Sequence, residues 1–161
     1  MWEKQIKMRE LEIDIRRLKF QRGRILGAIR RNYKQYWILG HDSDFYLVLV
    51  RRLYRQIEKD SKTDSKVANL KGKYQSLFAK IKIRDSFEHD EDLNLKDSPI
   101  KVSRSLIILK QDNKLSVKIQ SGIHQWDLES DHNLFIQAVK EHASLTDESD
   151  RIHSDEYESK K

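Results

Sequence analysis

The sequence predicts a mainly α-helical protein, a bundle of about four helices with a small antiparallel β-hairpin or three-stranded sheet near the C-terminus. Apolar residues recur in steps of three and four over long segments up to residue 81 and over a short one around residue 135, which is typical of amphipathic helices. Two segments rich in β-branched residues, joined by a short polar turn, follow the single proline, Pro99. Hydrophobic residues make up 37% of the 161 residues, enough for one domain with a small core.

The first helix is expected over residues 2–39. Its apolar face advances by three or four residues at a time, with one double step across Arg22. That face consists of Leu11, Ile15, Leu18, Ile25, Ile29, Tyr33 and Tyr36. Gly40 follows and can adopt the positive φ of the position after a helix end, so we expect the helix to stop there.

Two further helices are expected in the first half of the chain. Residues 41–44, His-Asp-Ser-Asp, offer Asp or Ser as the N-cap of a helix over residues 44–60. Its buried stripe would be Phe45, Leu49, Leu53 and Ile57. A third helix begins near Thr63 and delivers Arg84 at its end. Its apolar side consists of Val67, Leu70, Tyr74, Leu77, Phe78 and Ile81.

The last part of the expected fold is a hairpin followed by a helix. Residues 105–110 and 114–121 have the β-branched content of strands and flank Gln-Asp-Asn, a turn sequence. Residues 123–129 can add a third strand. A final helix is expected over residues 131–143, capped by Ser130 or Asp131. Its buried residues would be Leu134, Phe135, Ala138 and Val139.

Residues 1–143 are therefore expected to form one domain, followed by an acidic, disordered tail over residues 144–161. The tail has little apolar content and carries six acids against three bases, a net charge of −3. The whole chain carries +6, so the remainder carries +6 − (−3) = +9. Such an excess of positive charge favours an anionic partner.

Composition excludes several classes of protein. The chain has no cysteine, so it can form no disulfide, thiolate nucleophile or cysteine-based zinc site. The N-terminus is charged where a signal peptide would be apolar, and no stretch approaches the roughly 18 apolar residues of a membrane span. We expect a soluble, cytoplasmic protein with no membrane partner.

No cofactor or metal site is expected, because the six histidines are scattered along the chain. Glu129 and His132 are three residues apart and could share a metal ion, although such a pair more often marks the start of a helix. No glycine-rich phosphate loop or nucleophile elbow occurs either.

The densest positive charge lies in residues 16–34, which hold eight bases and no acid. These bases are Arg16, Arg17, Lys19, Arg22, Arg24, Arg30, Arg31 and Lys34. Like charges on one helix repel one another unless an anion is bound, so we interpret the block as a nucleic-acid-binding surface. Tyr33, Tyr36 and Trp37 are near enough to stack on bases. A solvated helix face and a helix lying on an anionic membrane are the alternatives.

Residues 84–89, Arg-Asp-Ser-Phe-Glu-His, hold the residue types that metal-independent RNA cleavage requires. RNA carries its own nucleophile, the 2′-hydroxyl, so an enzyme need only move protons and stabilise the extra negative charge on phosphorus. The imidazole of His89 can donate or accept protons near neutral pH. The guanidinium of Arg84 stays charged and offers a planar fork to phosphate oxygens. Alternatively, the two residues could simply complement the negative end of a helix dipole.

This segment resembles the Arg-x4-6-His motif of the HEPN superfamily, helical bundle domains found in many toxins and antiviral defence proteins. In catalytic members a polar residue follows the Arg, and Asp85 fits that preference. The resemblance implies a metal-independent endoribonuclease in which Arg84 stabilises the phosphorane and His89 transfers protons. Asp85 and Glu88 would orient these two side chains. It also implies a homodimer whose Arg–His pairs share a cleft, with RNA as the substrate, and it allows for a neutralising protein partner.

Two other functions stay open. The chain could be a non-catalytic nucleic-acid-binding or regulatory protein that uses the basic N-terminal helix. It could also be a protein-interaction module whose charges recruit another chain. Cleavage of RNA would distinguish the ribonuclease from both, and salt-dependent binding of RNA would distinguish the two others from each other.

Overall fold

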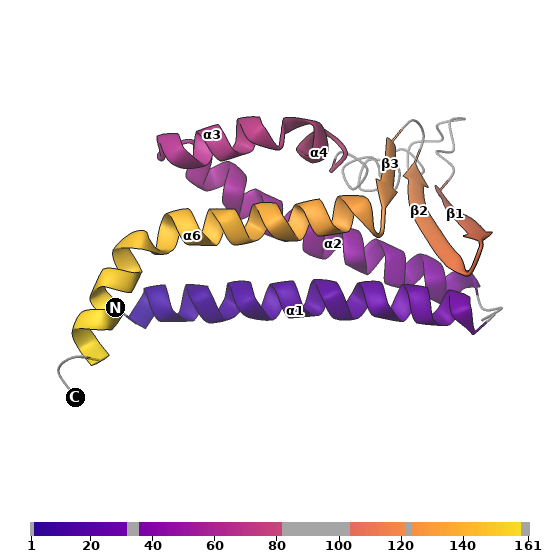
Figure 1. Cartoon of the computed structure of the whole chain (residues 1–161), viewed down its shortest axis with the longest axis horizontal. Coiled ribbons are helices and arrows are strands. Elements are labelled where there is room, and N and C mark those ends of the chain that lie inside the picture. The colour runs from indigo at the N-terminus through magenta and orange to yellow at the C-terminus, as the bar shows by residue number, and fades with distance from the viewer. Residues whose placement is uncertain (1, 32–35, 82–103, 122–123, 159–161) are drawn as a thin grey trace, which may run out of the picture.

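The computed structural model describes residues 2–31, 36–81, 104–121 and 124–158, and it shows a helical bundle with a three-stranded sheet at one end (Figure 1). The helices are α1 (Trp2–Arg30), α2 (Tyr36–Ser61), α3 (Ser65–Lys73), α4 (Gln75–Ala79) and α6 (Ser130–Glu158). The strands are β1 (Arg104–Gln111), β2 (Lys114–Ser121) and β3 (His124–Asp127). The predicted fold class, mainly helical with a late antiparallel sheet, is confirmed.

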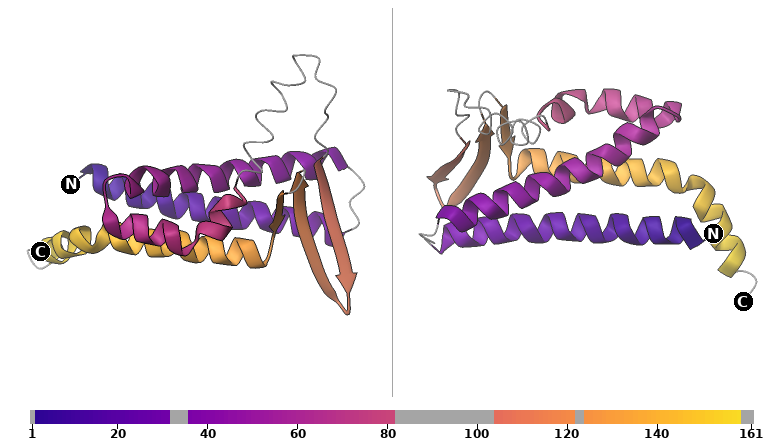
Figure 2. Two further views of the ribbon diagram at one scale, coloured as in Figure 1. Left: turned by 90° about the horizontal axis from the view of Figure 1, so that it is seen from above. Right: turned by 180° about the vertical axis from the view of Figure 1, so that it is seen from behind.

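The helices α1 and α2 pack side by side in opposite directions, and α6 lies against both of them and against α3 (Figures 1 and 2). The core fills the space between these helices and the inner face of the sheet. Fully buried side chains from four elements meet there: Leu18 of α1, Ile57 of α2, Trp126 of β3 and Phe135 of α6. The rings of Trp126 and Phe135 meet edge-on at a centroid distance of 5.8 Å, which ties the sheet to the bundle.

The boundary between the first two helices differs from the sequence prediction. The second helix begins at Tyr36 and continues through Gly40, the residue expected to end the first one. Asp42 and Ser43, the residues expected to offer an N-cap, lie inside α2 and have other partners. Asp42 pairs with Arg24 of α1, and the Ser43 hydroxyl donates to the carbonyl one turn earlier at 2.7 Å. Contacts with α1 therefore outweigh the local capping signal.

Most predicted core positions are buried, but Phe45 and Leu134 are exposed. Next to Phe45, Tyr46 is fully buried instead, because its hydroxyl finds hydrogen-bond partners in the interior. The other residues predicted for these two helices are buried: Leu49, Leu53, Ile57, Phe135, Ala138 and Val139. On the apolar face predicted for the first helix, Leu18, Ile25 and Ile29 are buried and Ile15 is partly so. The side chains of Leu11, Tyr33 and Tyr36 have no described position.

The third predicted helix is divided into α3 and α4, which meet at Tyr74. The carboxylate of Asp64 caps α3 by accepting from the backbone N–H of Lys66 at 2.9 Å. Every residue of the predicted apolar side is buried, from Val67 in α3 to Ile81 just past α4. The predicted amphipathic face is thus confirmed although the helix is interrupted, since both pieces turn the same side to the core.

The hairpin forms as the sequence predicts, and β3 is the expected third strand. β1 and β2 pair antiparallel, with Gln111 opposite Lys114 at the turn, and β3 pairs with the other edge of β2. Asp112 and Asn113 have φ values of 50° and 62°. These positive angles form a two-residue turn of the kind that Asp and Asn tolerate and that matches the twist of the strands.

The N-terminus of α6 has a reciprocal cap. The carboxylate of Asp127 accepts from the backbone N–H groups of Glu129 and Ser130, at 2.8 and 2.9 Å. The carboxylate of Asp131 accepts in turn from the N–H of Asp127 at 2.8 Å. Burial raises the pKa of Asp127, but the hydrogen bonds from the two N–H groups lower it by more. The pKa of Asp127 is therefore below its ordinary value. The cap therefore comes from Asp127, with Asp131 in support, and not from Ser130.

The last helix is longer than the sequence suggests. α6 continues to Glu158 and includes most of residues 144–161, which the composition indicates as a tail. Leu145 packs against the core, and the Thr146 hydroxyl bonds to two carbonyls of the preceding turn at 3.1 Å each. The domain end expected at residue 143 thus falls inside a helix. The last turns of α6 extend past α3 (Figure 1).

Candidate nucleic-acid interface

The Arg–His segment lies outside the described residues. Its four expected site residues, Arg84, Asp85, Glu88 and His89, and the basic Lys34 therefore have no described position. The described chain reaches the buried Ile81, three residues before Arg84. The ribonuclease site stays a prediction from the sequence.

The other bases of the basic block have described positions on or directly after α1. They are Arg16, Arg17, Lys19, Arg22, Arg24, Arg30 and Arg31. Arg22 is the one that the fold uses most directly, because it is half-buried and its Nε donates to the backbone carbonyl of Leu128. This bond joins α1 to the junction of β3 and α6. The remaining six side chains are exposed.

Arg17 and Arg24 are held in place by buried acids while staying accessible. Arg17 lies 3.6 Å from the carboxylate of Asp14, and Arg24 lies 3.4 Å from that of Asp42. Both carboxylates are buried, yet more than half of each arginine side chain is exposed. Arg52 of α2 also reaches Asp14, at 3.2 Å. Such arginines lose little freedom on contacting a phosphate, because their positions are already fixed.

Four bases of the block are less restrained. Arg16 bonds to Glu12 at 2.7 Å, but both side chains are mostly exposed, so the pair contributes only about 0–1 kcal/mol to stability. Lys19, Arg30 and Arg31 are exposed and form no salt bridge with the residues that the structure describes. All four cations can turn toward an added anion at little cost.

An apolar and basic stripe runs along the outer side of α1. Ile13, Arg17, Phe20 and Arg24 succeed one another at spacings of four, three and four, so they share one side of the helix. All four are exposed, and Phe20 exposes 67% of its surface. A ring this exposed contributes little to the core and is available to a ligand.

A second stripe runs along α2 and contains two more exposed aromatic residues. It consists of Trp37, His41, Phe45 and Val48, at spacings of four, four and three. Trp37 exposes 73% of its surface and Phe45 exposes 47%. Of the three aromatic residues that the sequence suggests for base stacking, only Trp37 has a described side chain.

The two stripes border the same side of the antiparallel pair formed by α1 and α2. Arg52, four residues after Val48, shares the Asp14 carboxylate with Arg17 of the first stripe, and Arg24 of that stripe pairs with Asp42 of α2. Arg24 and Asp42 pair across the two helices, so they lie at the same height along the helix axes. Phe45 follows Asp42 by about one turn, and Phe20 precedes Arg24 by about one turn. Both steps lead in the same direction, so the two phenylalanines lie at similar heights. We call the surface formed by these two stripes the aromatic–arginine face.

Sequence reasoning located the basic residues of this face but not Phe20 or Phe45. Phe20 lies outside the apolar stripe of its helix and has arginines one turn before and one turn after it. That pattern is the signal that points to it. Phe45 gives no such signal, because its spacing fits the core stripe equally well.

A buried chain of three hydrogen-bonded side chains lies in the interior. The Nε1–H of Trp126 donates to the hydroxyl oxygen of Tyr46 at 3.0 Å, and that hydroxyl lies 2.9 Å from Nδ1 of His132. The Tyr46 hydroxyl still has its own proton to donate, and Nδ1 accepts it in the tautomer of His132 that carries its proton on Nε2. Burial, then the charges of Arg22 and Lys19, lower the pKa of His132 to about 4. His132 is therefore neutral at pH 7, and its role is to hydrogen-bond Tyr46 within the core.

Glu129, the residue that could share a metal ion with His132, is exposed while His132 is buried. In the described part of the chain, no three His, Asp or Glu side chains are grouped so as to hold a metal ion. A second buried histidine, His142, bonds through Nε2 to Asp60 at 2.8 Å and links α6 to the end of α2.

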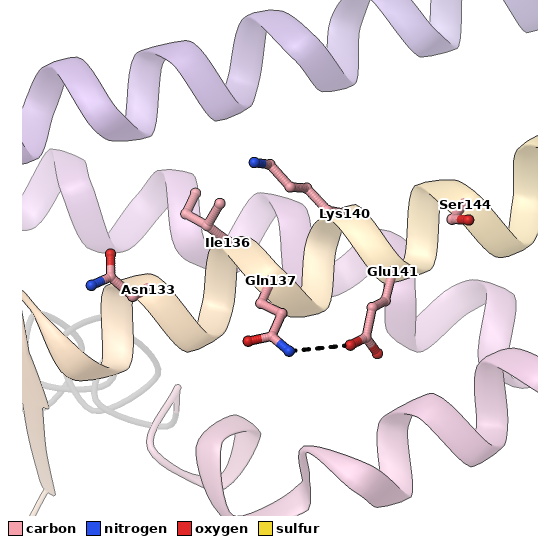
Figure 3. Close-up of a pocket in the computed structure, with 6 residues that line it drawn as sticks. All are labelled: Asn133, Ile136, Gln137, Lys140, Glu141 and Ser144. Carbon is pink, nitrogen blue, oxygen red and sulfur yellow. Dashed lines mark hydrogen bonds between the residues drawn. The ribbon is translucent and has the colours of Figure 1, made fainter.

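A shallow depression follows one side of α6 (Figure 3). It is lined by Asn133, Ile136, Gln137, Lys140, Glu141 and Ser144. Its acid, Glu141, is held by Tyr74 at 2.8 Å, by Lys73 at 3.1 Å and by Gln137 at 3.4 Å. These bonds lower the pKa of Glu141, and the bond from Tyr74 has the largest effect. The carboxylate is therefore ionised, and its oxygens are already engaged by neighbouring side chains. We assign no reaction to this depression.

No protein-family model, curated protein or solved structure matches the chain. The likeness to the HEPN superfamily therefore rests on residues 84–89 alone. Within the described ranges, no helix is both long enough and apolar enough to cross a membrane. The aromatic–arginine face is the described surface on which a functional proposal can be built.

Proposed function

We propose that the chain is an RNA-binding protein that holds a single-stranded segment on the aromatic–arginine face. One observation carries the proposal: Phe20, Trp37 and Phe45 are exposed next to arginines that buried acids keep in place. Proteins bind single strands with this combination, in which bases stack on aromatic rings and cations follow the backbone. Each stacked base contributes roughly 1–3 kcal/mol to binding.

The arginines would supply the other half of the interaction. Arg17 and Arg24 lie on either side of Phe20 in the α1 stripe, so a strand whose bases stack on Phe20 would bring its phosphates within reach of them. Arg16 and Arg31 lie beside the stripe and add charge that attracts the strand from a distance.

In its fuller form, the proposal is a HEPN-like, metal-independent endoribonuclease that acts as a toxin or an antiviral defence component. The 2′-hydroxyl of the bound RNA would attack the neighbouring phosphate, with Arg84 stabilising the charge on phosphorus and His89 transferring protons. Asp85 and Glu88 would orient them. The support for this form is the motif at residues 84–89 together with the RNA-binding chemistry of the face. A homodimer with a shared cleft, a neutralising partner and a cytoplasmic location belong to it.

Binding is tested with fluorescently labelled single-stranded RNA, by anisotropy at low and at physiological salt. We expect Phe20→Ala and Trp37→Ala each to weaken binding by roughly 5- to 150-fold, the equivalent of 1–3 kcal/mol. Leu134→Ala is the matched control, because Leu134 is a similarly exposed apolar residue on α6. Equal affinity in all four proteins would show that the face does not bind RNA.

Cleavage is tested with the same RNA in the presence of EDTA, beside Arg84→Ala and His89→Ala. We expect the wild type to cut and both variants to bind without cutting. Binding without cleavage in all three proteins would leave a non-catalytic RNA-binding protein. The absence of binding at physiological salt would reject both forms and favour a protein-interaction module.

A further inference from the structure

Arg17 of α1 and Arg52 of α2 share one buried carboxylate. Nη1 of Arg17 lies 3.6 Å from one oxygen of Asp14, and Nε of Arg52 lies 3.2 Å from the other oxygen. The side chain of Asp14 is only 9% exposed, while those of the two arginines are 56% and 57% exposed. The acid therefore lies beneath the two guanidinium groups, which present N–H groups to the outside of the molecule.

This cluster carries more positive charge than its own acid neutralises. One arginine is enough to pair with Asp14, and the second brings the sum to +2 − 1 = +1. Two guanidinium groups that meet at one carboxylate also repel each other, and Asp14 compensates for this only from the buried side. An anion on the exposed side would complete the neutralisation. An ion pair that served only to join α1 to α2 would not require the second arginine.

Phosphate is the anion that suits the cluster. Each guanidinium has five N–H donors in a planar fork, and contact with Asp14 occupies only part of them. Both groups reach a single carboxylate, so they are also close enough to reach a single phosphate, whose oxygens match the fork. The exposed ring of Phe20 follows Arg17 by about one turn of α1, so a base can stack beside the phosphate. This combination favours a phosphate of a nucleic-acid strand over a free anion.

We propose that Arg17 and Arg52 together bind one phosphate of the RNA strand whose bases stack on Phe20 and Phe45. This phosphate site rests on the proposed RNA binding and extends it. Arg52 lies on α2, outside the basic block of residues 16–34, so the two helices hold one phosphate between them. The strand then follows the seam between α1 and α2 rather than α1 alone.

The position of this site along the helices agrees with the rest of the aromatic–arginine face. The pairs Asp14–Arg52 and Arg24–Asp42 both cross from α1 to α2. They are separated by 24 − 14 = 10 residues on α1 and by 52 − 42 = 10 residues on α2, which is about 15 Å along each helix. The two exposed phenylalanines of the face lie between these levels, so cations flank the rings on both sides. A strand with stacked bases advances about 3.4 Å per nucleotide and passes from one level to the other in about four steps.

The test is the affinity of the full chain for labelled single-stranded RNA, measured by fluorescence anisotropy. Arg52→Gln should weaken binding roughly tenfold, because the phosphate loses one of its two charged partners. Arg52→Lys keeps the charge but not the planar fork, so it should restore only part of the affinity. Lys114→Gln removes an exposed charge at the hairpin turn and is the control, which should bind like the wild type.

A double-mutant cycle shows whether the two arginines act on the same phosphate. If they do, the combination of Arg17→Gln and Arg52→Gln should weaken binding at least about twofold less than the product of the two single effects. Arg24 lies at the other level and would contact a different phosphate. The effects of Arg24→Gln and Arg52→Gln should therefore multiply.

The outcomes separate this site from RNA binding as such. RNA binding that Phe20→Ala weakens and Arg52→Gln leaves unchanged would overturn the phosphate site alone, whereas a wild type that binds no RNA would overturn both proposals. Full affinity in Arg52→Lys would show that Arg52 supplies only charge, and multiplying effects of Arg17→Gln and Arg52→Gln would show two separate contacts. Either result rejects the shared phosphate. Urea denaturation identifies a variant that fails to fold, and Arg52→Lys, which keeps a cation beside Asp14, then replaces Arg52→Gln.

Discussion

The hydroxyl of Tyr46 lies 2.9 Å from Nδ1 of His132, although 86 positions of sequence separate the two residues. Trp126 joins them by donating its indole N–H to the same hydroxyl. All three side chains are buried, so their bonds tie α2, α6 and β3 together at a single point of the core. Each polar atom depends on its partners, because no water competes for it there.

Tyr46→Phe should therefore destabilise the protein strongly. The substitution removes one oxygen and leaves both the indole N–H of Trp126 and Nδ1 of His132 without a partner, at a cost of roughly 1–3 kcal/mol for each. Urea denaturation gives the change in free energy of unfolding. Tyr74→Phe is the comparison, because it removes a hydroxyl that bonds to the half-exposed Glu141. An equal loss of unfolding free energy in the two variants would show that the buried hydrogen bonds of Tyr46 stabilise the protein no more than the bond of Tyr74 does.

Stability should fall as the pH drops below about 6.5. Burial, followed by the charges of Arg22 and Lys19, lowers the pKa of His132 from 6.5 to about 4 in the folded state. Between these values the unfolded chain binds a proton that the folded chain does not, so acid favours unfolding. Below about pH 4 both states are protonated and this contribution no longer changes. One such proton gives a slope of about 1.4 kcal/mol per pH unit at most.

The pH dependence is measured by urea denaturation between about pH 4 and 7. Carboxylates also titrate there, so His132→Asn is compared with the wild type at each pH, and the difference isolates the histidine. We expect the variant to show the flatter profile. His41→Asn, at an exposed position of α2, is the control and should follow the wild type. Parallel profiles for His132→Asn and the wild type would exclude the proposed linkage.

Gly40→Ala should stabilise the protein by roughly 0.4–1 kcal/mol. Gly40 lies inside α2, and an added Cβ would meet nothing within 4 Å. Alanine restricts the unfolded chain and suits a helix interior. If the first helix instead ended at Gly40 with positive φ, the same substitution would destabilise the protein. The sign of the change in thermal unfolding thus decides between the two helix boundaries.

Arg16→Gln should weaken RNA binding without affecting stability. The Arg16–Glu12 pair is exposed on both sides, so its loss changes the free energy of unfolding by well under about 1 kcal/mol. If Arg16 contacts one phosphate of a single strand, the slope of log K against log salt should become shallower by about 0.7. Lys114→Gln removes an exposed charge at the hairpin turn and is the matched control. An unchanged slope in Arg16→Gln would mean that this residue contacts no phosphate.

Local patterns were sufficient wherever neighbouring residues in the sequence decide the structure. The apolar side from Val67 to Ile81 is buried as predicted, because helical spacing alone places those residues on one face. The turn at Asp112 and Asn113 follows from their tolerance of positive φ. The basic character of α1 is likewise a property of the sequence, and it directs attention to an anionic ligand before any coordinates are known.

The tertiary structure decided what distant segments do to one another. Arg22 belongs to the basic block by sequence, but Leu128, 106 positions away, engages its guanidinium. Gly40 reads as a helix end, yet α2 runs through it because Asp42 and Ser43 find other partners. Phe45 and Tyr46 fit the core stripe almost equally well, and the buried partners of the Tyr46 hydroxyl settle the choice. Periodicity fixes which residues share a face, but the free energy of burial depends on what lies opposite, and only the assembled fold supplies that.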